Sequence, residues 1–141
     1  MRSALTMLFA AAVISGAMAA TTPFYKTINR DNPGQRVKIT NFLAPGKTSV
    51  FAFVSDYCSD CTRLKPMLKQ LTQQRSDVVV LKVNVNRPGV RVIDYNSPVA
   101  LQYGARDLPY FIIYNRDGAL VSQGDAAYQT VMNMLHMAGI Q

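Results

Sequence analysis

The chain has 141 residues, of which 49% are hydrophobic and 16% charged, and its formal net charge is +7 at pH 7. This length suits a single domain with a core large enough to fold without disulfide scaffolding, and the composition is unlike that of disordered chains. The positive charge is scattered, with no basic run interleaved with aromatic residues. That argues against nucleic acid as a partner and leaves a solvated basic surface, an acidic partner or an anionic membrane surface as explanations.

The first 19 residues have the pattern of a secretory signal peptide. Arg2 provides a positive start, the apolar stretch 5–14 is too short to span a bilayer, and Ala17-Met18-Ala19 offers a cleavage site. We therefore expect an exported mature chain that begins near Ala20, most simply in a bacterial periplasm. Retention of the segment as an uncleaved membrane anchor is the alternative. Export would place the two cysteines of the chain where disulfides persist.

The mature chain opens with a segment that shows little regular pattern. Residues 20–36 have mixed polarity and end in the turn signal Asp31-Asn32-Pro33-Gly34. We expect them to form an extended lead-in to a domain that spans residues 37–141. In residues 37–40 apolar and polar side chains alternate, which predicts a short strand.

A buried strand and an amphipathic helix follow. The apolar run over residues 49–55 is typical of a strand that is buried on both faces. After this run the spacing of apolar residues becomes helical: leucines recur at i, i+4 and i+7 and would share one face of a helix. We therefore predict a helix over residues 59–74. Pro66 lies inside this helix and should bend it, since proline cannot donate a backbone hydrogen bond.

The second half of the chain alternates between strands and helices. The expected elements are a buried strand over 78–85, a loop over 86–96, a short helix from Ser97-Pro98 to Tyr103, a strand over 110–114, a hairpin return strand over 120–123 and a closing helix over 126–138. Strands that alternate with helices indicate an α/β fold with a mainly parallel sheet covered on both faces. The final hairpin adds an antiparallel edge.

Both cysteines, Cys58 and Cys61, stand at the junction of the first buried strand and the following helix. Three residues apart in a helical turn, they share one face and are near enough to bridge. The free N–H groups of a helix start favour a thiolate at Cys58, which we expect to be the more exposed sulfur. A thiolate attacks a disulfide, and a second nearby thiol resolves the mixed disulfide. The spacing therefore predicts a redox pair with Cys58 as nucleophile and Cys61 as resolving thiol.

Two other uses of the cysteine pair are weaker. A structural disulfide that closes so small a loop restricts the unfolded chain very little. A structural zinc site requires four ligands, and besides the two cysteines the chain has a single histidine, His136, which is distant in sequence. The spacing thus favours redox use, without a metal at this pair.

Several further motifs accompany the cysteine pair. They are the aromatic-Cys-x-x-Cys stretch from Tyr57 to Cys61, the helix proline Pro66, the pair Leu108-Pro109, Lys82 on a central strand, and the hairpin glycines Gly118 and Gly124. Together they make the chain resemble the thioredoxin family from about Val37 to Met137. The resemblance implies a thioredoxin fold and an oxidoreductase that acts on protein thiols and disulfides, with the redox-active disulfide Cys58–Cys61 and no other cofactor. Because the chain has no nucleotide or flavin motif, its electrons would come from a partner, typically a membrane electron-relay protein.

The resemblance also assigns a role to Pro109. It implies that this proline follows a cis peptide bond and faces the cysteines, and that the backbone before it pairs with an extended substrate. Leu108, Pro109 and Tyr110 would then line a docking groove together with Tyr57. A proline just before a strand fits this role, because it cannot donate to the strand ladder there. A trans proline at an ordinary strand start is the alternative.

Three features depart from the family's pattern, and the first concerns proton transfer. Where the family commonly has a buried aspartate, six positions before the first cysteine, this chain has Ala52. Lys82 therefore loses its usual partner, and the deprotonation of Cys61 needs another explanation. Asp56 could act through water, or it could simply be a surface acid.

The second departure is the dipeptide between the cysteines, and the third is a long loop. Ser59-Asp60 stands where reducing thioredoxins have Gly-Pro and strong oxidants have Pro-His. The charge of Asp60 should repel a thiolate and raise the pKa of Cys58, which stabilises the reduced form less. We therefore predict a reductase, with an oxidase or isomerase as the near alternative.

The loop over residues 87–96 could shape partner choice or be a tolerated surface insertion.

A different class of function rests on the last predicted helix. Met132, Met134, His136 and Met137 supply thioether and imidazole groups that suit Cu(I), so a copper-binding protein is an alternative. Methionines at helical spacing usually fill a core, which is the plainer interpretation. A redox-inert interaction module with the same fold is a third possibility.

Overall fold

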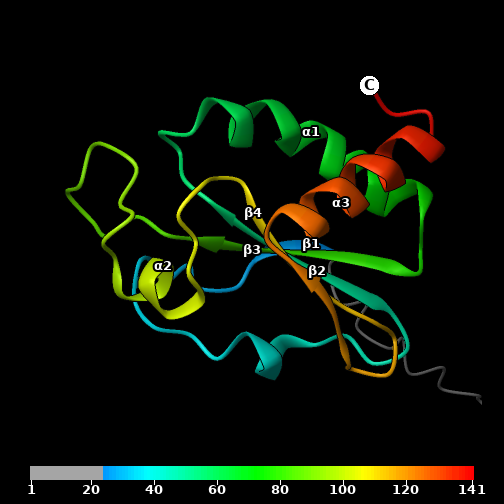
Figure 1. Ribbon diagram of the computed structural model, residues 1–141, viewed down its shortest axis with the longest axis horizontal. Coiled ribbons are helices and arrows are strands. Elements are labelled where there is room, and N and C mark those ends of the chain that lie inside the picture. Colours follow the sequence, from blue (N-terminus) through cyan, green and yellow to red (C-terminus); the bar gives the residue numbers. More distant parts are fainter. Residues whose placement is uncertain (1–23) are drawn as a thin grey trace, which may run out of the picture.

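The computed structural model describes residues 24–141, which form a five-stranded mixed sheet with helices on both faces (Figure 1). The strands are β1 (Tyr25–Thr27), β2 (Thr48–Val54), β3 (Val78–Asn84), β4 (Tyr110–Tyr114) and β5 (Leu120–Gln123). The helices are α1 (Ser59–Gln74), α2 (Pro98–Tyr103) and α3 (Asp125–Met137), with a short 3-10 helix, η1 (Ile39–Phe42). The predicted signal peptide lies outside the described residues.

The strand order across the sheet is β1-β3-β2-β4-β5. β3 runs parallel to β1 and β2, whereas β4 is antiparallel to both β2 and β5. Phe53 of β2 lies opposite Tyr110 of β4, so the start of β4 meets the carboxyl end of β2. The predicted α/β fold, with parallel central strands and an antiparallel hairpin at one edge, is confirmed.

Two apolar clusters fill the spaces on either side of the sheet, because alternate residues of a strand point to opposite faces. The first cluster lies between the sheet and the pair α1 and α3, and it includes Ala52, Leu64 and Leu68. The second lies between the sheet and the side that carries α2 and η1, and it includes both cysteines. Figure 1 shows α1 and α3 on one side of the strands and α2 on the other.

Two expectations for the N-terminal part are wrong. Residues 37–40 do not form a strand, because their backbone groups bond to side chains of α2: the Tyr103 hydroxyl donates to the carbonyl of Val37 at 2.6 Å and accepts the N–H of Ile39 at 3.1 Å. The first strand lies earlier, where Tyr25–Thr27 pairs with β3. The sheet therefore begins inside the segment that we expected to be a lead-in.

The other predicted strands and helices are present, with ends that differ by at most one residue. α1 continues through Pro66 without interruption. Within residues 24–141, no helix has the length and apolar character needed to cross a membrane.

Candidate active site

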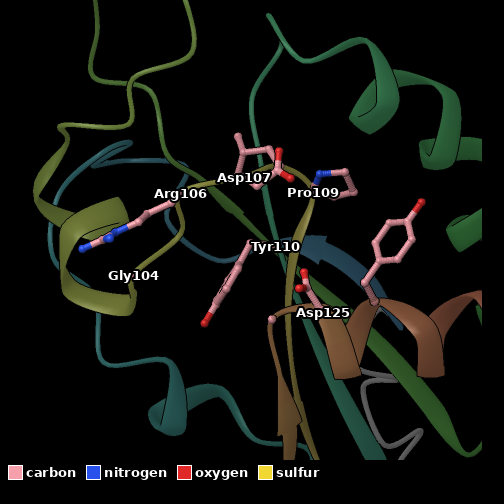
Figure 2. A pocket seen from close by; sticks show the side chains of 9 residues that line it. Gly104, Arg106, Asp107, Pro109, Tyr110 and Asp125 are labelled. Atoms are coloured by element: carbon pink, nitrogen blue, oxygen red, sulfur yellow. The ribbon is translucent and has the colours of Figure 1, made fainter.

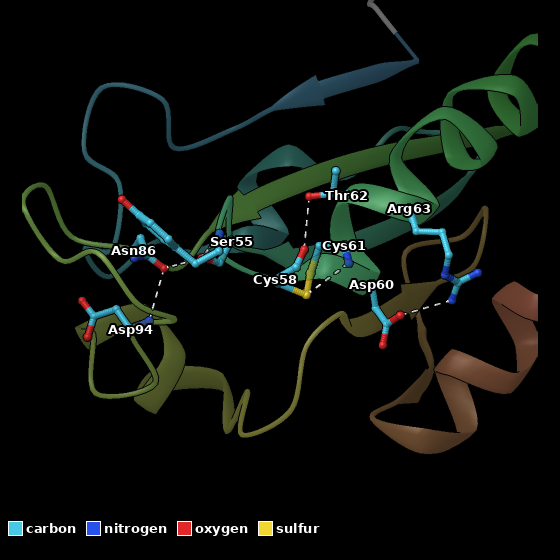
Figure 3. The surroundings of a disulfide bond; sticks show 9 residues. Ser55, Cys58, Asp60, Cys61, Thr62, Arg63, Asn86 and Asp94 are labelled. Carbon is cyan, nitrogen blue, oxygen red and sulfur yellow. Dashed lines mark hydrogen bonds and ion pairs between the residues drawn. A yellow bond between two sulfur atoms is a disulfide. The ribbon is translucent and has the colours of Figure 1, made fainter.

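Cys58 and Cys61 form a disulfide at the amino end of α1 (Figure 3). Their Cα atoms lie 5.2 Å apart, within the ordinary range for a bridged pair. Cys58 is the N-cap of the helix, with extended backbone angles, and its Sγ accepts the N–H of Cys61 at 3.1 Å. A donor aimed at this sulfur, together with the positive end of the helix dipole, favours negative charge on Cys58.

The exposure of the two cysteines differs from the expectation. Cys58 is 4% exposed and Cys61 is 6% exposed, so Cys58 is not the more accessible residue. Both belong to the apolar cluster on the α2 side of the sheet, which also contains Phe53 and Leu108. The packing of this cluster shields both side chains in the disulfide state. An attacking sulfur therefore has to enter an apolar surrounding and leave its water behind.

A hydrogen-bonded network supports the turn that carries Cys58. The carbonyl of Ser55 accepts the N–H of Cys58 at 3.1 Å, and its hydroxyl accepts the N–H of Tyr57 at 3.2 Å. The same hydroxyl donates to Asn86 Oδ1 at 2.6 Å, and this oxygen also accepts the N–H of Asp94 at 3.2 Å (Figure 3). The long loop after β3 is thus tied to the active-site turn. Sequence reasoning missed Ser55 and Asn86, whose only signal is a small polar residue after each of two buried strands.

Asp60 lies in the first turn of α1 and faces Arg63, at an oxygen–nitrogen distance of 3.5 Å (Figure 3). Both side chains are exposed, and so is Ser59. An exposed ion pair of this kind contributes little to stability. Its positive partner nevertheless offsets part of the negative charge that Asp60 brings to the neighbourhood of Cys58.

The peptide bond between Leu108 and Pro109 is cis and directly precedes β4. Because Tyr110 pairs with Phe53, Pro109 comes beside the carboxyl end of β2, which leads to the cysteines. A cavity of about 350 Å³ opens here and is lined by Leu108, Pro109 and Tyr110. Tyr57, which we expected in the same groove, is 50% exposed and does not line this cavity.

The rest of the cavity comes from residues that sequence reasoning did not assign to a site. They are Gly104, Arg106, Asp107, Gly124, Asp125 and Tyr128. Figure 2 shows Asp125 at the start of α3, facing the loop that carries Asp107 and Pro109. Asp125 belongs to no sequence motif. It lies at the cavity because β5 runs back along β4 and places the start of α3 beside Tyr110.

The sequence motifs also pointed to Lys82 and Asp56, and both line a cavity together with Cys61. This second cavity has a volume of about 180 Å³ and is also lined by Tyr25. Lys82 pairs in register with Ala52 on β2, so a methyl group stands where the family has a carboxylate.

Lys82 lies in an unusual electrostatic environment. Its Nζ is 4.7 Å from the centre of the Tyr25 ring. Burial lowers the pKa of Lys82, and the positive charges of Lys65 and Arg30 lower it further, whereas Asp56 acts in the opposite direction. A lysine of this kind gives up its proton more readily than one on the surface.

The methionines and the histidine of α3 are divided between the core and the surface. Met132 and Met134 pack against the apolar cluster below the helix, whereas His136 and Met137 are exposed. Within residues 24–141, no three His, Cys, Asp or Glu side chains are grouped so that they could hold a metal ion. Packing explains the first two methionines without copper.

A sequence model of the thioredoxin family matches residues 35–136. The chain belongs to the thioredoxin family. The resemblance inferred from the cysteine motif, Pro66, Lys82 and Pro109 is thereby confirmed.

Individual thioredoxins match parts of the chain. Thioredoxin-T of Drosophila melanogaster is 34% identical over 89 residues, which are 62% of this chain and 49% of that protein. Thioredoxin 1 of Synechococcus elongatus is 37% identical over 70 residues, 49% of this chain and 57% of that protein. The chain thus spans about half the length of these two curated relatives.

A solved structure agrees with the fold. The thioredoxin f2 complex with ferredoxin:thioredoxin reductase matches with a TM-score of 0.59 at 21% identity, covering 84% of this chain and 98% of that chain. At this level of identity the likeness supports the fold of residues 24–141 and says nothing further about their chemistry.

Proposed function

We propose that this thioredoxin-family protein is an exported thiol-disulfide oxidoreductase that reduces disulfides of protein substrates. The observation that carries the proposal is the Cys58–Cys61 disulfide at the start of α1, on the end of the sheet where the cis peptide bond before Pro109 also lies. A bridged pair at this helix start can be opened and closed by thiol–disulfide exchange.

The reaction proceeds in two exchanges. In the reduced protein the Cys58 thiolate attacks one sulfur of a substrate disulfide, whose S–S bond breaks and releases the other sulfur as a thiol. Cys61, as thiolate, then attacks Cys58 Sγ in the mixed disulfide, forms the intramolecular bond and releases the second substrate sulfur. Two electrons pass to the substrate, and no cofactor other than the cysteine pair takes part.

We place substrate binding on the surface around Pro109, whose neighbour Leu108 shares an apolar cluster with both cysteines. We assign Leu108, Pro109 and Tyr110 to it because they share the larger cavity, and Tyr57 because it is exposed and directly precedes Cys58. An extended substrate segment laid along this surface would bring its sulfur into the apolar surrounding of Cys58. Desolvation there strengthens the interaction of the thiolate with the Cys61 N–H.

The direction of electron flow follows from the charge near Cys58. Asp60 disfavours the thiolate, and its pairing with Arg63 offsets only part of that effect. The reduced form is therefore stabilised less than in strongly oxidising members of the fold. We expect a reduction potential closer to about −270 mV than to about −120 mV, the values typical of thioredoxin and of a strong oxidant.

Export and the electron donor are part of the proposal. Residues 1–19 carry the pattern of a cleaved signal peptide, which supports export to a periplasm. A membrane electron-relay protein is the proposed donor, since an exported protein is separated from cytosolic reductants. The solved complex of another thioredoxin with a reductase is a precedent for a partner on this fold.

An insulin-reduction assay with dithiothreitol tests the activity. We expect the protein to accelerate reduction, and Cys58→Ser to abolish the acceleration. Met137→Ala, at an exposed position on α3, is the control and should keep full activity. If the unaltered protein gives no acceleration, the protein is a redox-inert interaction module instead.

For an active protein, a redox titration against glutathione measures the reduction potential of the cysteine pair. A low potential indicates a reductase and a high potential an oxidase.

A further inference from the structure

The loop that joins β3 to α2, residues 85–97, has an unusual distribution of polar and apolar side chains. Asn86 and Asp94 are buried, with exposed fractions of 7% and 4%, whereas Val92, which lies between them in the chain, is 67% exposed. Most proteins show the opposite pattern, because burial of a polar group is costly unless that group is hydrogen-bonded. The β3–α2 loop therefore keeps its polar groups inside and turns an apolar side chain toward solvent.

The amide of Asn86 holds this loop in one conformation. Its Nδ2 donates to the carbonyl of Val90 at 2.9 Å and to the carbonyl of Val92 at 2.7 Å. Its Oδ1 accepts the hydroxyl of Ser55 and the N–H of Asp94, so the amide uses both of its donors and both of its lone pairs. The loop is thus ordered before a partner arrives, and a partner that binds there does not incur the cost of ordering it.

The sheet places the β3–α2 loop beside the redox pair. β2 and β3 are parallel neighbours with Val54 in register with Asn84, so the chain leaves both strands at the same end of the sheet. From there β2 leads to Cys58 and β3 leads to the loop, and the hydrogen bond between Ser55 and Asn86 joins the two segments (Figure 3). Figure 1 shows the loop extending past the sheet at the end where α1 begins. A protein segment bound at the redox pair therefore has this loop on one flank.

Pro109 lies on the opposite flank. In the sheet β2 stands between β3 and β4, and Pro109 directly precedes β4. The cysteines follow the middle strand, so the β3–α2 loop and the segment around Pro109 border them on two sides. Substrate bound next to Pro109 would therefore lie between two walls.

Val92 is placed where such a substrate would meet the loop. The neighbouring residue, Ile93, packs against the apolar cluster that contains both cysteines and Leu108. Val92 is thus next to a residue anchored in that cluster, while its own side chain faces solvent. Tyr57, which directly precedes Cys58, is exposed as well. Single exposed apolar residues are common on protein surfaces, but these two lie on segments that are hydrogen-bonded to each other at the redox pair.

We propose that the β3–α2 loop is a preformed wall of the substrate site, and that Val92 contacts an apolar residue of the substrate beside the cysteine under attack. The inference rests on the proposed disulfide exchange and deepens it by naming a substrate class. That class is proteins whose disulfides are flanked by exposed apolar residues, as in chains that have not finished folding.

Turnover of two matched peptides tests the contact. Each is a disulfide-linked dimer of a short peptide, whose cysteine is flanked on both sides by valine in one case and by serine in the other. Dithiothreitol drives turnover, and chromatography measures the peptide thiol released above the uncatalysed background. The ratio of the two kcat/KM values gives the preference for apolar flanks. We expect the unaltered protein to prefer the valine-flanked peptide, and Val92→Ser to lower that preference about 3- to 5-fold, the effect of removing part of one apolar contact.

Val121→Ser is the matched control. Val121 is 56% exposed, but it lies on β5, the edge strand that pairs only with β4, away from the β3–α2 loop. The same change of side chain should keep the preference of the unaltered protein there.

Asn86→Ala tests whether the loop has to be held in place. This variant keeps Val92 but removes the four hydrogen bonds of the amide, so the preference should fall as it does in Val92→Ser. Any change at the Ser55 turn or in the chemistry of Cys58 affects both peptides alike and cancels in the ratio. Circular dichroism checks that the variant is folded, and if it is not, the result for Val92→Ser decides alone.

The outcomes that contradict the proposal are distinct. An unchanged preference in Val92→Ser overturns it, and so does an equal loss in Val121→Ser. A folded Asn86→Ala protein that keeps the preference overturns the claim that the loop has to be preformed. Equal turnover of the two peptides by the unaltered protein overturns the substrate class while the exchange itself stands. Absence of turnover with both peptides would instead overturn the proposed exchange, and this inference with it.

Discussion

At the scale of single residues, the behaviour of Cys58 depends on a small number of charges and donors. The Cys61 N–H favours its thiolate, and Asp60 disfavours it, with Arg63 as a partial counter-charge. These effects act on the reduced protein alone, because a disulfide carries no charge. They therefore set the reduction potential of the pair.

Asp60→Asn tests this balance. Removal of the negative charge stabilises the Cys58 thiolate, and the potential should rise by about 10–20 mV, the scale of a single solvent-screened charge. Arg63→Gln should lower the potential by a similar amount, since Asp60 then acts unopposed. Titration against glutathione measures both. Equal shifts of the same sign in the two variants would contradict this account of the electrostatics.

At the scale of elements, the turn before η1 and the loop after β3 are packed against each other. Gly34 has a φ of +78°, and a Cβ placed on it would lie 2.7 Å from the backbone nitrogen of Arg87. Its N–H donates to the carbonyl of Asn84, and its own carbonyl accepts from Val99. The turn therefore fixes the base of the loop that reaches Asn86 and the active-site turn.

Gly34→Ala should destabilise the protein by about 3 kcal/mol or more, because the left-handed conformation and the overlap with Arg87 both cost energy. Gly46→Ala is the matched control: Gly46 has a φ of +75° but open space around it, and the cost should be about 1–2 kcal/mol. Urea unfolding of both variants measures the difference. Similar losses would mean that the close approach to Arg87 is not maintained in solution.

The same loop is closed by an ion pair. Arg87 Nε donates to Asp94 Oδ2 at 2.7 Å and a second guanidinium nitrogen donates to Oδ1 at 3.0 Å, while the Asp94 side chain is only 4% exposed. Hydrogen bonding to Arg87 lowers the pKa of Asp94 below its ordinary value. A carboxyl with a lowered pKa stabilises the fold at pH values above its ordinary pKa, and this contribution is lost as the pH falls through the lowered value.

Asp94→Asn should therefore lower the melting temperature by several degrees at pH 7, and the difference from the unaltered protein should shrink as the pH falls below about 4. Asp77→Asn removes an exposed ion pair with Arg75 and should have a much smaller effect at pH 7. Thermal melts over a pH series measure both. A difference for Asp94→Asn that stays constant down to pH 2 would contradict the assigned role of its charge.

The sequence predicted those elements whose signals are local. For these elements a pattern of a few neighbouring residues is enough to predict the structure: the buried runs of β2 and β3, the leucine stripe of α1, and the Ser97-Pro98 start of α2. β1 is three residues of mixed polarity, and only its pairing with β3 makes it a strand. Residues 37–40 alternate in polarity, yet the hydroxyl of Tyr103 takes up their backbone groups.

The same distinction holds for the site. Cys58, Cys61 and Pro109 could be predicted because their spacing and neighbours form a motif. The burial of Cys58, the role of Asn86 and the position of Tyr25 over Lys82 depend on contacts between residues far apart in the chain. Such contacts leave no periodic or compositional trace in the sequence.

At the scale of the whole molecule, the proposed export makes a prediction about the covalent chain. Cleavage after Ala19 should give a mature protein whose first residue is Ala20, and the intact mass of the protein from a periplasmic fraction should correspond to residues 20–141. A full-length mass in the membrane fraction would support the uncleaved anchor. A full-length mass in the cytosolic fraction would contradict export.

The central claim is that Cys58 forms mixed disulfides with other proteins and that Cys61 resolves them. The most direct measurement is trapping in the native host with Cys61→Ser, followed by non-reducing electrophoresis and identification of the adducts. The account predicts abundant protein adducts that disappear on reduction and are absent from a Cys58→Ser, Cys61→Ser double variant. Adducts that persist in the double variant, or none with Cys61→Ser, would contradict it.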